Sequence, residues 1–94
     1  MAVVVDMRFP GSKIAVYDAV MAETDLVGAS ADQVPGLIAH YAFEQDGSLR
    51  VIDIWETAEQ WQAFSAGTIV SAATRAGLTI DPDVTISELH ATIR

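Results

Sequence analysis

The feature that most constrains this chain is an Asp46-Gly47 pair between two apolar runs, residues 36–44 and 49–56. Asp-Gly favours a two-residue hairpin, because both central positions of the turn need positive φ. The two runs therefore predict neighbouring antiparallel strands. If the residues flanking Asp-Gly pair with each other, the register continues so that His40 lies opposite Asp53.

Segments on either side of the hairpin complete a β-α-β-β-α-β order. The expected strands are 2–9, 36–44, 49–56 and 84–93, and the expected helices are 13–24 and a longer one that begins at Thr57 and ends before Gly77. Short connections and right-handed crossovers then predict an antiparallel sheet in the order 4-1-3-2, with both helices on one face. This is a ferredoxin-like α+β fold, formed as a single domain over residues 1–94.

Alternation along the hairpin divides its side chains between two faces. The face expected to meet the helices carries Leu37, Ala39, Tyr41, Phe43, Ile52 and Ile54. The face expected to stay uncovered carries Ile38, His40, Ala42, Leu49, Val51, Asp53 and Trp55, with Val84 and Ile86 from the last strand. An uncovered apolar surface of this size usually marks an interface, so the pattern predicts a homodimer that packs sheet against sheet.

Composition excludes several classes of protein. The 94 residues carry a net charge of −8, which argues against binding to nucleic acid or to an anionic membrane surface. There is no cysteine for a disulfide, a thiolate nucleophile or a thiolate metal site. Because the start lacks signal-peptide features and no apolar run approaches ~20 residues, a cytoplasmic location is expected.

The sharpest candidate for chemistry is the cross-strand pair His40 and Asp53. A carboxylate beside an imidazole favours the protonated ring and fixes its tautomer, which is how a general base is oriented. Glu88 and His90 share one face of the last strand and are expected to extend this site as substrate-binding residues. The alternative is a polar cluster that only sets the register of a dimer interface. The spacing of these four residues matches no metal-binding signature, so no metal is expected.

Aromatic side chains form a second candidate site, for a flat ligand. Tyr41 and Trp61 each combine an apolar ring with a polar group, and they are expected to form a substrate wall between sheet and helices. Trp55 is a further expected substrate-binding residue. In this arrangement Arg50 lies at the rim, and the irregular segment 25–35 covers the pocket as a lid. The alternative is that the aromatic residues are core. No glycine-rich phosphate loop is present, so no nucleotide cofactor is expected.

The sequence resembles the antibiotic biosynthesis monooxygenase-like dimeric α/β barrel family. The resemblance rests on the segment 36–40, on Asp53-Ile54-Trp55 at the end of a strand, and on Phe64 in the helix that follows. The closing strand with His90 also fits small members of this family. The match covers nearly the whole chain in the order of its elements, and its motifs are short.

This resemblance implies a homodimer whose two sheets form a barrel. It also implies a monooxygenase that needs no cofactor and acts on an aromatic or polyketide-like small molecule. Family oxygenases often place an asparagine in the cleft, but this sequence contains none. Two alternatives stay open: a non-catalytic homodimer of the same fold that binds a small molecule, and an isomerase or cyclase that uses the same base chemistry.

Overall fold

The computed structural model describes residues 1–93, and its elements follow the predicted order. The strands are β1 (Val3–Phe9), β2 (Leu37–Gln45), β3 (Ser48–Trp55) and β4 (Asp83–Glu88). The helices are α1 (Ile14–Met21), α2 (Ala58–Phe64) and α3 (Val70–Arg75), with a 3-10 turn at Ala31–Gln33 and a π-helical turn at Ser65–Ile69. The last strand is thus shorter than the predicted 84–93.

The hairpin between β2 and β3 has the predicted turn and register. Asp46 and Gly47 both adopt positive φ, at 52° and 78°, as a two-residue turn of this kind requires. His40 pairs with Asp53, as expected. The register shifts by one residue between Leu37 and Ala39, so that Leu37 lies opposite Trp55. This β-bulge puts Leu37 on the same face of the sheet as His40.

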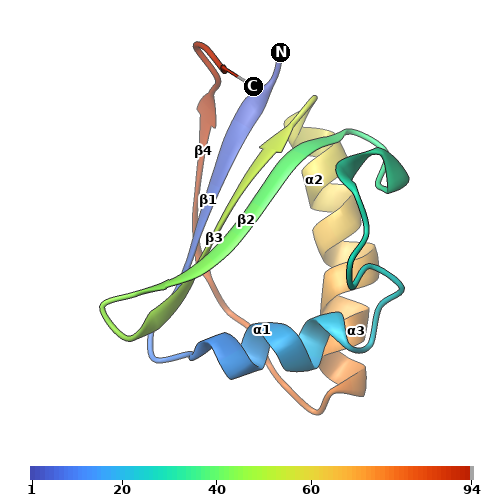
Figure 1. Cartoon of the computed structure of the whole chain (residues 1–94), viewed down its shortest axis with the longest axis vertical. Coiled ribbons are helices and arrows are strands. Elements are labelled where there is room, and N and C mark those ends of the chain that lie inside the picture. Colours follow the sequence, from blue (N-terminus) through green and yellow to red (C-terminus); the bar gives the residue numbers. More distant parts are fainter. Residues whose placement is uncertain (94) are drawn as a thin grey trace.

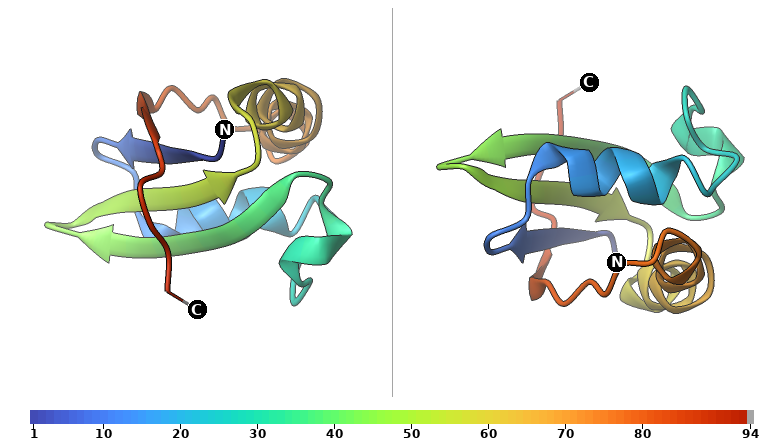
Figure 2. Two further views of the ribbon diagram at one scale, coloured as in Figure 1. Left: turned by 90° about the horizontal axis from the view of Figure 1, so that it is seen from above. Right: turned by 90° about the horizontal axis from the view of Figure 1, so that it is seen from below.

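The four strands form one antiparallel sheet in the order β2-β3-β1-β4, which confirms the predicted order. All three helices lie on the same side of this sheet (Figure 1). The π turn joins α2 to α3 in one continuous helical rod, seen end-on in Figure 2. The molecule therefore has two layers, with one sheet face covered and the other bare.

The prediction of which face the helices cover is wrong. The alternate residues of β3 that are buried are Leu49, Val51, Asp53 and Trp55, the set expected on the uncovered face. Trp55 is fully buried and its ring packs against Phe64, with ring centroids 5.3 Å apart. Asp53 can be buried on this face because its carboxylate binds His40 and the indole N–H of Trp55, so it does not keep the face in water.

The first strand explains why this face is the covered one. Val3, Val5 and Met7 of β1 are all buried, and Val5 lies opposite Asp53 in the sheet. The apolar side of β1 and the His40–Asp53 side of the hairpin are therefore the same face. Val84 and Ile86 of β4 also belong to it, opposite Met7 and Val5, although they remain 39% and 38% exposed.

The uncovered face keeps an apolar surface, but from the other set of residues. Its half-buried apolar side chains are Val4, Phe43, Ile52 and Ile54, and it also carries the exposed ring of Tyr41. Arg50 pairs with Asp6 on this face, where Arg50 also lies 5.9 Å from the centre of the Phe43 ring. The expectation of an apolar sheet face without helices thus holds, with its residues exchanged. Arg50 does not lie at the rim of the space between sheet and helices.

Candidate functional site

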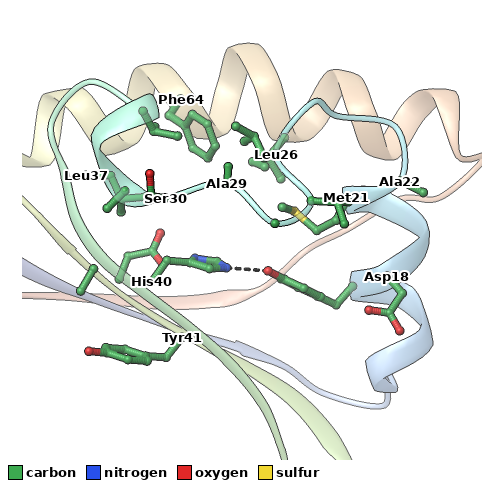
Figure 3. Close-up of a pocket in the computed structure, with 18 residues that line it drawn as sticks. Asp18, Met21, Ala22, Leu26, Ala29, Ser30, Leu37, His40, Tyr41 and Phe64 are labelled. Carbon is green, nitrogen blue, oxygen red and sulfur yellow. Dashed lines mark hydrogen bonds and ion pairs between the residues drawn. The ribbon is translucent and has the colours of Figure 1, made fainter.

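A cavity of about 760 Å³ lies between β2, α1 and the segment that joins them. Its apolar wall comes from five parts of the chain: Met21, Leu26, Val34, Leu37, Phe64 and Ile69. Figure 3 shows Phe64, Leu26 and Leu37 around the space above His40. Most residues between 26 and 34 line the cavity, as expected for the lid predicted at 25–35. Phe64 and Ile69 stand at the two ends of the π turn, a type of helical irregularity that is common at functional sites.

A chain of hydrogen bonds forms the polar part of the cavity wall. The Tyr17 hydroxyl lies 2.7 Å from Nε2 of His40, marked by the dashed line in Figure 3. On the other side of the ring, Nδ1 of His40 lies 2.5 Å from Oδ1 of Asp53. The second oxygen of Asp53 accepts the indole N–H of Trp55 at 3.0 Å. Both nitrogens of His40 are therefore engaged.

The donors in this chain follow from the chemistry of its ends. The Trp55 indole can only donate, so Asp53 accepts there, and as a carboxylate it accepts from His40 as well. Neutral His40 then carries its proton on Nδ1 and offers Nε2 as an acceptor. Tyr17 must donate its O–H to that nitrogen. We assign this tautomer from the hydrogen-bond network.

Burial and charge both favour this arrangement. The Asp53 side chain is 5% exposed, and that of His40 is 33% exposed on the cavity side. Burial raises the pKa of Tyr17, and the carboxylates of Asp53 and Asp18 raise it further. The phenol therefore stays protonated and keeps its role as donor at neutral pH. No lysine or arginine lines the cavity among residues 1–93.

Helix α1 places Tyr17 over the sheet. Its spacing from Val20 and Met21 keeps it on the side of the helix that faces β2, and its ring stacks on that of His40 with centroids 5.8 Å apart. The sequence does not indicate the partner of Tyr17. Its phenol at a helical core position was the available signal, since a buried tyrosine hydroxyl usually finds a hydrogen-bond partner.

The structure brings together His40, Asp53 and the indole N–H of Trp55, but it does not bring the other predicted site residues into contact with this group. Tyr41 borders the cavity but is 59% exposed, and its ring turns away from His40 (Figure 3). Trp55 reaches the site only through its N–H, because its ring is buried in the core. Trp61 is half-buried and lines a smaller apolar hollow of about 70 Å³, which shares Tyr17, His40 and Asp53 with the main cavity.

Glu88 and His90 lie far from the cavity. Glu88 is exposed and lies on β4, at the opposite edge of the sheet from β2, where it pairs with Val3 of β1. His90 is exposed beyond the end of β4. The four residues considered as metal ligands are thus split between two places. No group of three or more histidine, aspartate or glutamate side chains within residues 1–93 is arranged to hold a metal.

No protein-family model matches this sequence, and no curated protein matches it significantly. Solved structures do match over nearly the full length. Rv0793 from Mycobacterium tuberculosis superposes with a TM-score of 0.68 at 16% identity, covering 100% of both chains. SnoaB from Streptomyces nogalater, a cofactor-independent oxygenase, has a TM-score of 0.62 at 17% identity, covering 98% of this chain and 95% of SnoaB.

A third structure, a proposed antibiotic biosynthesis monooxygenase from Chloroflexus aurantiacus, superposes with a TM-score of 0.60 at 17% identity over 100% of both chains. The chain has the antibiotic biosynthesis monooxygenase fold. The resemblance seen in the sequence is confirmed at this level. In this chain the cavity lies between the sheet and the helices. No helix within residues 1–93 is long and apolar enough to cross a membrane.

Proposed function

We propose that this chain is a monooxygenase-like enzyme that needs no cofactor and deprotonates an aromatic or polyketide-like small molecule in the cavity. The observation that carries the proposal is the His40–Asp53 pair, which is built into the wall of a largely apolar cavity. His40 is the proposed base and Asp53 the group that stabilises the imidazolium it forms. The substrate anion, held away from water, would then react with dioxygen itself.

The properties of the cavity support a neutral aromatic substrate. Its volume of about 760 Å³ falls in the range typical of small-molecule sites, and most of the side chains around it are apolar. Asp18 and Asp53 stand at its wall, and no lysine or arginine among residues 1–93 lines it. The cavity therefore offers nothing to pair with an anionic substrate. Of the predicted aromatic residues, Tyr41 borders the main cavity and Trp61 lines the smaller hollow beside it.

Structural similarity supports the oxygenase class. SnoaB, which shares the fold over nearly its whole length, is a cofactor-independent oxygenase. A single chain of this fold can provide a base and a cavity that excludes water. These are the two things that this class of reaction requires from a protein. The roles first expected of Tyr41, Glu88 and His90 in substrate binding stay predictions.

We also propose that the chain forms a homodimer through its uncovered sheet face. Phe43, Ile52 and Ile54 lie there with no helix over them, and burying even a few hundred Å² of such surface contributes several kcal/mol at ~25 cal/mol per Å². A two-fold axis would pack this face against its copy. The cavity lies on the opposite side of the sheet, so dimerisation leaves it open.

The test compares the wild-type protein with His40→Gln, using a panel of polycyclic phenols and an oxygen electrode. Glutamine can still hydrogen-bond Asp53 but cannot take up a proton. We expect oxygen uptake by the wild type and at least a ~100-fold loss in the variant. Equal uptake by both proteins would contradict the proposal. Saturable binding without product would indicate a binding protein, and product without oxygen uptake would indicate an isomerase or cyclase.

A further inference from the structure

We infer that Tyr17 is the group that takes the substrate's proton, while it passes its own proton to His40. This inference rests on the proposed function and deepens it. It makes Tyr17 a catalytic residue and His40 the proton store behind it. It also restricts the substrate to a class, neutral molecules with an acidic O–H such as phenols and enols.

Access to His40 is the first argument. Its Nδ1 is held by Asp53 at 2.5 Å and its Nε2 by the Tyr17 hydroxyl at 2.7 Å. A substrate in the cavity therefore meets no free nitrogen of the imidazole. To reach Nε2 directly it would have to displace Tyr17, whose ring is stacked on His40. Tyr17 lines the cavity, and its hydroxyl is the group that holds Nε2, so a proton from a ligand reaches His40 through that hydroxyl.

The direction of the Tyr17 hydrogen bond is the second argument. The phenol donates its only proton to His40, so the lone pairs of its oxygen remain free to accept from a ligand. Burial and the charges of Asp53 and Asp18 raise the pKa of Tyr17, so the oxygen carries a proton ready for transfer. Asp18, Asp53 and Tyr41 are the other ionisable residues at the cavity, and none is a cation.

The step balances without any further reagent. The substrate O–H bond breaks and its proton forms a new O–H bond on Tyr17, while the former Tyr17 proton moves to Nε2 of His40. The products are a substrate oxyanion and an imidazolium, and the imidazolium is paired with the Asp53 carboxylate. Tyr17 then donates its new O–H to the oxyanion and stabilises it.

This geometry selects O–H acids over C–H acids. A phenol or enol O–H forms a strong hydrogen bond to the Tyr17 oxygen before transfer, whereas a C–H forms only a weak one. A substrate carboxylate or phosphate in the cavity would meet two acidic residues, and no lysine or arginine of residues 1–93 lines the cavity to pair with it. The inferred ligand is therefore an uncharged hydroxyaromatic or enolic compound.

The experiment uses 2-hydroxyanthraquinone as a probe, because its colour reports its ionisation, its O–H has no intramolecular hydrogen bond, and it is not itself expected to be oxygenated. Absorbance is titrated against pH for the dye free and bound to the wild type, Tyr17→Phe, His40→Gln and the control Thr74→Val. Thr74 is exposed on α3 and does not line the cavity, so this change also removes one hydroxyl but leaves the proposed site intact. We expect the wild type and Thr74→Val to lower the pH at which the dye ionises by at least one unit. Tyr17→Phe and His40→Gln should bind the dye but lose this shift.

Other outcomes separate the two proposals. If Tyr17→Phe keeps the shift and His40→Gln loses it, His40 acts directly and the inference fails, while the proposed function stands. If His40→Gln keeps the shift, the relay fails. If the wild type produces no shift or does not bind the dye, both fail. A measurement without ligand adds a check: 15N shifts should show neutral His40 protonated on Nδ1, and a proton on Nε2 would overturn the relay.

Discussion

Each face of the sheet carries one aspartate paired with a basic side chain, and the two pairs differ in kind. On the covered face, His40 and Asp53 share one hydrogen bond, and the Asp53 side chain is 5% exposed. On the uncovered face, Arg50 binds Asp6 through two N–H groups, at 2.7 and 3.1 Å, and the Asp6 side chain is 22% exposed.

The chemistry of the base explains what the difference means. A guanidinium keeps its proton at any physiological pH, so Arg50 and Asp6 form a fixed ion pair. An imidazole can donate a hydrogen bond at one nitrogen and accept one at the other, so His40 binds Asp53 through Nδ1 and Tyr17 through Nε2. This second pair lines the cavity between sheet and helices. The same sheet thus has a fixed ion pair on one face and, on the other, the pair proposed to act in catalysis.

The largest effect is expected for Asp53→Asn. The same change on the other face, Asp6→Asn, is made as a separate variant for comparison. Asparagine at position 53 can donate to Nδ1 of His40 and so stabilise the wrong tautomer, which should lower turnover by about 10²–10⁴-fold. Asparagine at position 6 should change turnover by less than about twofold. The oxygen electrode assay measures both. Equal losses would show that the two pairs do not differ in function.

Next in size is the loss of the proposed dimer in Ile54→Asp. A carboxylate in the centre of an apolar sheet interface would lie without a partner, so the dissociation constant should rise at least ~100-fold. Sedimentation velocity at micromolar concentration measures it. Val70→Asp is the control, because Val70 is 47% exposed on α3, on the helical side of the molecule. A wild-type protein that sediments as single chains would refute the dimer.

A smaller effect is expected on stability in Trp55→Phe. The change leaves Asp53 with one donor in a buried place, which should lower the free energy of unfolding by about 1–3 kcal/mol. Tyr41→Phe on the uncovered face should change it by less than about 0.5 kcal/mol. Urea denaturation measures both variants. Equal stabilities would mean that the indole N–H contributes nothing to the buried carboxylate.

The smallest effect concerns acid. The hydrogen bond from Arg50 lowers the pKa of Asp6 below its ordinary value of 3.8, and the charges of Arg50 and Arg8 act in the same direction. A lowered folded-state pKa means that the pair stabilises the protein above about pH 3.8 and that this contribution is lost as the pH falls further. Asp6→Asn should lower the Tm by about 1–4 °C at pH 6, and the difference should shrink as the pH falls below 3.8 and Asp6 takes up a proton. A difference that persists in strong acid would assign the effect to packing.

The sequence was sufficient for everything that a tight turn or a short connection determines. Asp46-Gly47 defines the hairpin and its register, and that register is what predicted that His40 and Asp53 lie side by side. The order of the strands followed from the connections in the same way. These features depend on local geometry, which the residues themselves encode.

Which face the helices cover could not be predicted in this way. Both faces of the hairpin are apolar enough to be buried, and the choice depends on how β1 pairs with β3, where Val5 lies opposite Asp53. No tight turn joins these two strands, so neighbouring residues in the sequence do not determine their register. The partnership of Tyr17 with His40 is likewise a contact between distant segments. Helical spacing indicates the side of α1 but not the atom that the hydroxyl meets.

The bulge near the start of β2 has a consequence for how this protein could diversify. Because one extra residue at Ile38 breaks the alternation, Leu37 and His40 both line the cavity although they are three positions apart. Shape and reactivity are thereby placed on separate residues of one strand. Exchanging Leu37 for a smaller or larger side chain would change the room for a ligand while His40 keeps its position, which makes this strand a natural starting point for altering selectivity.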